Sequence, residues 1–201
     1  MEFRIVYRKI KKIQAIRGFL PAYFCYAAGV QTVMIVAAAF GAKELKLESS
    51  KLIITILLIQ LLAIVGAMLM SRLSRRFGNI PVLASVVCVW IVICVSAFYI
   101  HTEMQFYLLA CVVGIVMGGI QSLSRSTYSK FLPESIKDTA SFFSFYDVTE
   151  KLAIVLGLFS FALIEQMTRN IRYSAITLSL FFILGLLLLL RLYKSQKTQI
   201  L

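Results

Sequence analysis

The 201-residue chain is 60% hydrophobic, and its 21 lysines and arginines outnumber its 9 acidic residues. With a mean hydropathy of +0.89, it carries more apolar surface than a soluble domain of this length can bury, so the composition predicts an integral membrane protein in contact with a lipid bilayer. The basic residues lie mostly between apolar runs rather than on one folded face, which argues against binding to nucleic acid.

Six apolar runs follow one another along the chain and are joined by short connections. A run of about 20 residues forms roughly 30 Å of helix, which matches the hydrocarbon core of a bilayer. The first run is too long for the apolar part of a signal peptide, since 25 uncharged residues separate Arg17 from Lys43. We therefore predict an all-α polytopic membrane protein with six transmembrane helices over 18–191, a basic lead over 1–17 and a tail over 192–201. The expected spans are about 18–42, 52–71, 80–100, 104–124, 139–164 and 173–190.

The basic residues divide unequally between the two sides of the predicted membrane domain. With the N-terminus inside, 15 of them face the cytoplasm and 5 face the opposite side, an asymmetry typical of the positive-inside rule. We therefore expect both termini in the cytoplasm, and a bacterial cytoplasmic (inner) membrane as the location. The inner set is Arg4, Arg8, Lys9, Lys11, Lys12, Arg17, Arg72, Arg75, Arg76, Arg125, Lys130, Lys137, Arg191, Lys194 and Lys197. The outer set is Lys43, Lys46, Lys51, Arg169 and Arg172.

Uncharged polar side chains interrupt the first two spans. Tyr26 and Gln31 lie in the first span, and Gln60 lies in the second. A single polar side chain within a span either hydrogen-bonds a neighbouring helix or contacts a substrate, and both interpretations stand for each of these residues.

The sequence contains no motif typical of an enzyme or of a metal site. It has no HExxH, GxSxG or Walker pattern, and none of its cysteines forms a CxxC pair. We therefore expect no catalytic residue, cofactor or metal ion, and we interpret the cysteines as packed thiols. The four cysteines, all within apolar runs, are Cys25, Cys88, Cys94 and Cys111.

The fourth span ends in a polar face. Gly114 and Gly118 form a GxxxG pattern, which permits close approach of another helix. Gln121 and Arg125 continue the face of Gly118 toward the cytoplasmic end. Arg125 either binds a carboxylate, from a substrate or from the fifth span, or caps the helix and faces lipid headgroups.

The fifth run carries three charged residues, Asp147, Glu150 and Lys151, in a segment otherwise apolar enough to cross a membrane. Charge at that depth is costly, and it usually marks a pathway, a relay or a buried ion pair. Asp147 and Lys151 are four residues apart, so one interpretation is a structural ion pair between them. The other is a substrate contact or proton carrier, for which Glu150 is the better candidate, because Lys151 can neutralise only one carboxylate well. In both cases this face is expected to look into a bundle or an aqueous cavity.

Three stretches together resemble one family: GVQTVM at 29–34, GGIQSLSRSTYSKFLP at 118–133 and SFYDVTEK at 144–151. They are similar to the C-terminal half of major facilitator superfamily transporters, in the branch of the vacuolar amino-acid effluxer of autophagy. The resemblance covers nearly the whole chain, from about Arg17 to Arg191. It implies that the six spans correspond to helices seven to twelve of a twelve-helix transporter.

The segment MSRLSRRFGN at 70–79 resembles the gating loop of that superfamily, and the candidate gating residues are Arg72, Arg75, Arg76 and Gly78. The chain departs from the family pattern at three positions. Ala28 stands where relatives often carry an acid, Arg75 stands where an aspartate is common, and Leu158 follows Gly157 where relatives often have proline.

Transporters of this superfamily consist of two six-helix halves, so the resemblance predicts a partner: a missing N-terminal half or a second copy of this chain. The first functional hypothesis is therefore a secondary-transporter half that moves a small organic solute, an amino acid by resemblance, by alternating access. The alternative is a non-transporting membrane scaffold. A cavity between Asp147, Glu150 and Gln121 would favour transport, and dry helix contacts there would favour a scaffold.

Overall fold

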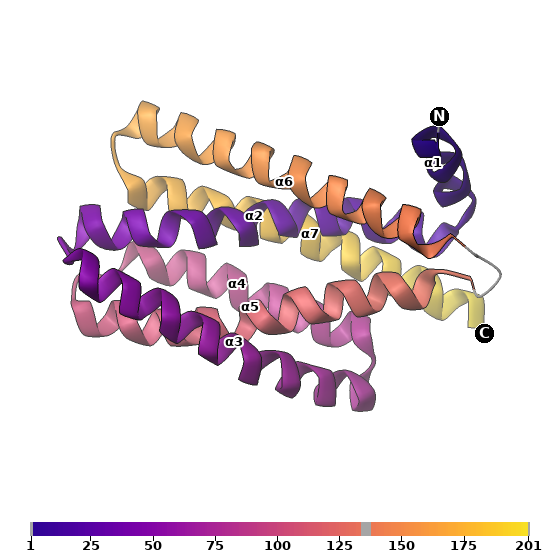
Figure 1. Ribbon diagram of the computed structural model, residues 1–201, viewed down its shortest axis with the longest axis horizontal. Coiled ribbons are helices and arrows are strands. Elements are labelled where there is room, and N and C mark those ends of the chain that lie inside the picture. Colours follow the sequence, from indigo (N-terminus) through magenta and orange to yellow (C-terminus); the bar gives the residue numbers. More distant parts are fainter. Residues whose placement is uncertain (1, 134–137, 201) are drawn as a thin grey trace.

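The computed structural model describes residues 2–133 and 138–200, and every regular element in these ranges is an α-helix. Lys137, which the topology prediction counted, lies outside the described residues, as does the side chain of Arg4. The helices are α1 (Glu2–Lys12), α2 (Gln14–Glu44), α3 (Ser49–Phe77), α4 (Asn79–Phe98), α5 (Glu103–Phe131), α6 (Thr139–Thr168) and α7 (Ile171–Ile200). Helices α2 to α7 run side by side along the long axis, with α1 and both chain ends at the same end of the bundle (Figure 1).

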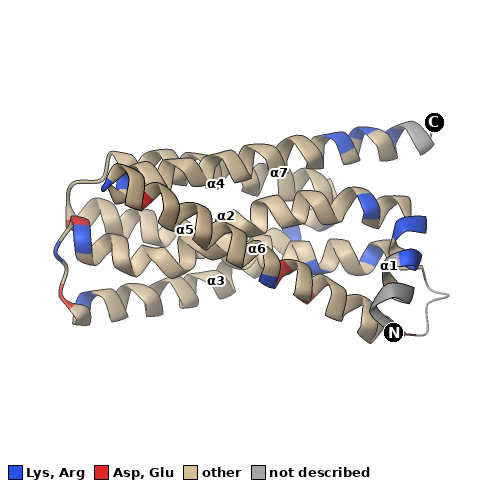
Figure 2. Cartoon of the chain, turned by 90° about the horizontal axis from the view of Figure 1, so that it is seen from above, with Lys and Arg blue, Asp and Glu red and all other residues tan. Residues whose placement is uncertain are grey.

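Five of the described helices are long and apolar enough, by length and composition alone, to cross a membrane: α2, α3, α4, α5 and α7. The predicted class, an all-helical polytopic membrane protein, is therefore confirmed, whereas α6 is not among these five. Lysines and arginines gather at the two ends of the bundle, and a small group of charges lies near the middle of α6 (Figure 2).

The helices extend beyond the apolar runs that predicted them. The second run was expected to end at Ser71, but α3 continues to Phe77, because the arginine-rich segment that follows contains good helix formers and no breaker. Helix α3 ends at Gly78, whose φ of +87° is open to glycine and strained for other residues. The fourth run was expected to end near Ser124, but α5 continues to Phe131 and stops just before Pro133.

The basic lead contains a helix that the sequence analysis did not predict. Val6 and Ile10 of α1 are buried, and Ile13 is half-buried. These residues recur at the spacing of a helix face, so α1 packs an apolar side on the bundle while Arg8 and Lys9 stay exposed.

Close backbone contact joins α3 to α5. A Cβ atom added at Gly118 would strike the carbonyl group of Ala63, and one added at Gly66 would strike that of Ile115. Gly114 likewise faces the backbone of Ile59. We call Gly66, Gly114 and Gly118 the glycine seam; the GxxxG pattern of the fourth span serves helix packing here.

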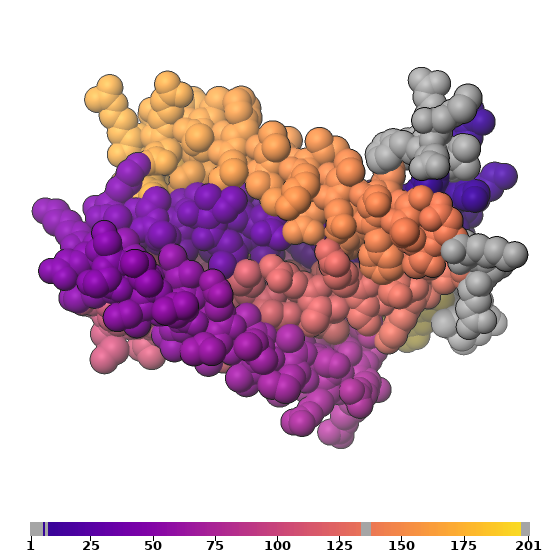
Figure 3. Space-filling model, viewed as in Figure 1, coloured from indigo at the N-terminus to yellow at the C-terminus, as the bar shows by residue number. Residues whose placement is uncertain are grey.

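The other contacts pack the helices around a largely apolar core. Helix α3 packs chiefly on α5, α4 lies between α5 and α7, and α2 packs on α7 and α6. Helices α2 and α5 share few contacts. On the face seen in Figure 3, α6 and α3 form the two edges, with parts of α2 and α5 between them. Apolar side chains on these edges are exposed, among them Leu61 of α3 at 64% and Phe159 of α6 at 66%.

Candidate functional site

A polar cavity of about 110 Å³ lies where α2, α5 and α6 meet. The three helices that surround it are mostly apolar, so the polar side chains that line it are a small polar group in an apolar bundle. Space of this size accommodates several water molecules or the polar group of a small solute. The lining residues are Tyr23, Tyr26, Ala27, Val30, Gln31, Ile120, Gln121, Ser124, Arg125, Tyr146 and Glu150.

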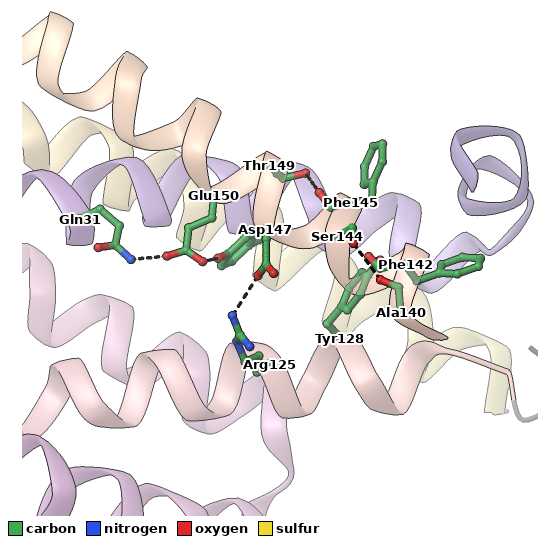
Figure 4. Close-up of polar contacts among 11 residues, drawn as sticks. Gln31, Arg125, Tyr128, Ala140, Phe142, Ser144, Phe145, Asp147, Thr149 and Glu150 are labelled. Atoms are coloured by element: carbon green, nitrogen blue, oxygen red, sulfur yellow. Dashed lines mark hydrogen bonds and ion pairs between the residues drawn. The ribbon is translucent and has the colours of Figure 1, made fainter. Parts of the chain in front are cut away.

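Glu150 accepts two hydrogen bonds across this cavity, both from α2. The Gln31 amide donates to Oε1 at 2.6 Å, and the Tyr23 hydroxyl donates to Oε2 at 3.0 Å. Figure 4 shows the carboxylate reaching toward Gln31. Both donors are uncharged, and no lysine or arginine in the described part of the chain forms an ion pair with Glu150. The carboxylate is therefore oriented by its partners without being neutralised by them.

Arg125 and Asp147 form an ion pair at the rim of the cavity. The guanidinium donates to Asp147 Oδ1 at 2.9 Å, and the two side chains are 58% and 49% exposed (Figure 4). The same guanidinium lies 5.7 Å from the ring centre of Tyr146. A pair this exposed contributes about 1 kcal/mol or less in water, so another carboxylate can replace Asp147 at modest cost.

Tyrosines build the wall between α2 and α6. The rings of Tyr23 and Tyr146 stack at 4.2 Å between centroids, and Tyr128 lies 5.0 Å from Tyr146. The Tyr128 hydroxyl donates to the carbonyl of Phe142 at 2.9 Å, which ties α5 to the first turns of α6. Tyr26 shares a 2.7 Å hydrogen bond with the Ser124 hydroxyl. The aromatic wall is thus rigid and presents a few hydroxyl groups to the cavity.

Residues 2–199 match the family described as vacuole effluxer Atg22 like. The chain belongs to this family. It is 29% identical over 193 residues to the uncharacterized MFS-type transporter YxiO of Bacillus subtilis (strain 168), covering 96% of this chain and 44% of the relative. It is also 30% identical to autophagy-related protein 22 of Vanderwaltozyma polyspora and 28% identical to that of Saccharomyces cerevisiae (strain YJM789), over 86% and 92% of this chain. It covers 34% and 36% of those two proteins, so the chain spans less than half the length of the curated relatives it matches.

In this Atg22-like chain, most of the residues singled out from the sequence meet at one place. Tyr26, Gln31, Gln121, Arg125 and Glu150 all line the cavity. Asp147 reaches its rim through Arg125, so the pair that the sequence suggested between Asp147 and Lys151 is replaced by one between helices. Lys151 is exposed and has no ion pair among the described residues.

Other candidates lie apart from the cavity of the Atg22-like chain. Gln60 is exposed on α3 and does not line it. The predicted gating loop is not a loop: Arg72, Arg75 and Arg76 are exposed on the last turns of α3, and Gly78 alone separates α3 from α4. Short connections of this kind need one residue of unusual φ, which Gly78 supplies.

Sequence analysis of the Atg22-like chain missed Tyr23, Tyr146 and Ser124. Aromatic residues in an apolar span resemble ordinary core residues, which explains the omission. A usable signal existed, because Tyr23, Ala27 and Gln31 recur every four residues on one helix face, as do Tyr146 and Glu150.

Proposed function

We propose that this chain forms one half of a secondary transporter that moves a small organic solute across a membrane by alternating access. The observation that carries the proposal is the polar cavity between α2, α5 and α6, in which Glu150 is held by uncharged donors. A scaffold needs no such cavity, whereas intramembrane carboxylates beside a cavity are typical of solute and ion pathways. The printed names of the relatives, an MFS-type transporter and vacuole effluxers, support the same class.

In this proposal α6 also crosses the membrane, as the fifth of six spans. It is 30 residues long, packs on α2 and α7, and exposes apolar side chains such as Val155 at 66%. An even number of spans leaves both termini on one side, which agrees with their shared end of the bundle (Figure 1). The excess of basic residues at that end favours a cytoplasmic orientation, in the cytoplasmic membrane of a bacterium.

The partner is a second set of six helices. Since the chain spans less than half of its relatives, an N-terminal half on the same or another chain is the partner we favour over a second copy. The partner covers the face bounded by α3 and α6 (Figure 3). Of the cavity residues, Gln121 and Arg125 are exposed and Glu150 is partly buried, so they are available to such a partner. Cross-linking from Leu61 or Phe159 in membranes should trap that partner, and links only between copies of this chain would identify the homodimer instead.

Each polar residue has a role in the proposal. Gln31, Gln121 and Tyr26 contact the solute, and Arg125 exchanges Asp147 for a carboxylate of the solute, as an amino acid would supply. Glu150 carries the coupling proton, because it is a carboxylate that lines the cavity and no lysine or arginine of the described residues pairs with it.

Replacing Glu150 with glutamine tests the coupling role. The full assembly should be reconstituted in vesicles and transport measured against pH. Glu150→Gln should abolish the pH dependence, because the amide cannot ionise, although it can still pair with Tyr23 and Gln31 once its NH2 group donates to one of their oxygens. The matched control is Glu165→Gln, on the same helix but paired with Lys43 outside the cavity. An unchanged pH profile of transport in Glu150→Gln rejects the coupling role of Glu150. If the unmodified chain binds its partner but the assembly moves no solute, the alternative hypothesis of a non-transporting scaffold is supported.

A further inference from the structure

A second polar pocket lies at the end of the bundle that holds both termini, between the start of α2 and the end of α7. Its volume is about 370 Å³. Its polar lining consists of Gln14 and Arg17 from α2 and of Arg191, Ser195 and Gln196 from α7. The transport proposal makes no use of this pocket, which shares no lining residue with the central cavity.

The charge of the pocket is entirely positive. Arg17 and Arg191 are exposed, neither has an ion pair in the described ranges, and no acidic residue lines the pocket. Two guanidinium groups from different helices that converge on one space attract a phosphate, with which arginine forms paired hydrogen bonds.

The pocket also has an apolar side. Pro21 and Leu188 line it one turn farther into the bundle than the arginines, and Gly18 brings α2 against Leu192. Arg17 immediately precedes the first long uncharged run, and Arg191 immediately follows the last apolar run. The arginines therefore lie at headgroup depth, with the apolar side chains at the depth of acyl chains.

One backbone acceptor adds to this arrangement. Pro21 has no N–H, so the carbonyl of Arg17, four residues earlier, lacks its usual helical donor. A carbonyl without its helical donor can accept a hydrogen bond from the hydroxyl group of a lipid headgroup. We infer that this pocket binds an anionic phospholipid, with its phosphate between Arg17 and Arg191 and an acyl chain along Pro21 and Leu188.

Native mass spectrometry of the purified full chain in detergent micelles, titrated with phosphatidylglycerol, tests the inference. The double variant Arg17→Gln/Arg191→Gln should bind about 25-fold more weakly, since each direct hydrogen-bonded contact between arginine and phosphate contributes about fivefold. The matched control, Arg75→Gln/Arg76→Gln, removes the same charge from exposed positions on α3 and should bind like the unmodified chain.

A second variant keeps every charge. Ser195→Phe fills the pocket from an exposed position on α7 and should also abolish phosphatidylglycerol binding. Three outcomes would overturn the inference: equal weakening in both double variants, equal binding of zwitterionic phosphatidylcholine, or displacement of the lipid by millimolar inorganic phosphate. The last result would identify a site for small anions instead of lipid.

Discussion

Replacing Gly118 with alanine places a methyl group where α3 and α5 are in backbone contact. The new Cβ atom would lie 2.5 Å from the carbonyl carbon of Ala63 and 2.8 Å from its Cα atom. Carbon atoms in ordinary contact are about 3.5–4.0 Å apart, so the two helices must separate by about 1 Å. The backbone cannot rotate away as a side chain can, and the whole glycine seam must open.

The expected loss of stability follows from two opposing terms. Overpacking a core costs about 1–3 kcal/mol of stability. Gly118→Ala should be at the upper end, about 3 kcal/mol, because the atoms that the new methyl group meets belong to the backbone of α3 and cannot move aside. Alanine gains about 1 kcal/mol over glycine in helix propensity, which leaves a net loss of about 2 kcal/mol. At the next residue, the Cβ atom of Gly119→Ala meets the side chain of Met70, which can change rotamer. A cost of about 1 kcal/mol is then offset by the same propensity gain, and Gly119→Ala should be nearly neutral.

Denaturant unfolding in mixed micelles measures this difference, and the one tryptophan of the chain, Trp90, is a buried fluorescent reporter. Gly118→Ala should be about 2 kcal/mol less stable than Gly119→Ala. The substitution also displaces Gln121 and Arg125, one and two turns later on α5, so solute binding should weaken in the same variant. Equal stability of the two variants would refute the reasoning, because it would mean that α3 and α5 are not in backbone contact.

Three further predictions concern the ends and the core of the bundle. Arg172→Gln should lower the stability to thermal unfolding by about 3 kcal/mol, because the Arg172 side chain is only 12% exposed and lies 2.6 Å from Glu44 of α2. Lys43→Gln should cost under about 1 kcal/mol, because the Lys43 side chain is 61% exposed in its pair with Glu165. Trp90→Phe should lower the stability measured by circular dichroism by less than about 1.5 kcal/mol, since the indole N–H has no partner among the described residues. Trp90→Ala should lower it by about 3–5 kcal/mol, because it leaves a cavity in the core, and equal losses in the two variants would contradict this reasoning. Hydrogen bonds from Ser141 lower the pKa of Asp138 below the ordinary 3.8. The Asp138 cap on α6 therefore contributes stability above pH 3.8, and this stability is lost as the pH falls through the lowered pKa. Asp138→Asn should remove this acid-side step from a plot of melting temperature against pH, and a step that persists in the variant would belong to another group.

The helices and their close approach could be predicted from local patterns. Apolar runs of bilayer length predicted the membrane helices, and Gly114 and Gly118 predicted close packing of α5 against another helix. These features depend on spacing along one segment, which the sequence displays directly. The ends of the helices were less accessible, because α3 continues to Phe77 through arginine-rich residues that form a helix readily but lack the apolar character used to mark the span.

The pairing within the site depends on contacts between segments, and it could be predicted only in part. Asp147 has Lys151 one turn away, which made that pair the obvious local choice. In the packed bundle Tyr128 of α5 instead bonds the carbonyl of Phe142 at the start of α6, and Arg125 reaches Asp147 from the same side of α5. Arg125 was correctly considered as a carboxylate partner. Whether it faces a carboxylate or the lipid headgroups depends on the rotation of α5 about its axis, which is set by the packing of the whole bundle.

The same limit explains Gln60 and Glu150. Gln60 was as good a candidate as Gln31 in sequence, yet α3 turns it outward while α2 turns Gln31 toward Glu150. The sequence left Glu150 without a partner because its two donors, 119 and 127 residues away, are an amide and a phenol in a different span. Such pairings carry no short-range signature.

The sparse contact between α2 and α5 has a mechanical consequence. The walls of the central cavity belong to helices that are each anchored elsewhere: α5 to α3 and α4, and α2 to α6 and α7. Moving α2 and α6 together away from α5 leaves the glycine seam and the Tyr23–Tyr146 stack intact, but it breaks the Tyr26–Ser124 and Arg125–Asp147 pairs and the Tyr128 hydrogen bond to Phe142. An arriving molecule can therefore widen the compartment by exchanging these few polar contacts, while the packing of α4 on α7 holds its two sides together.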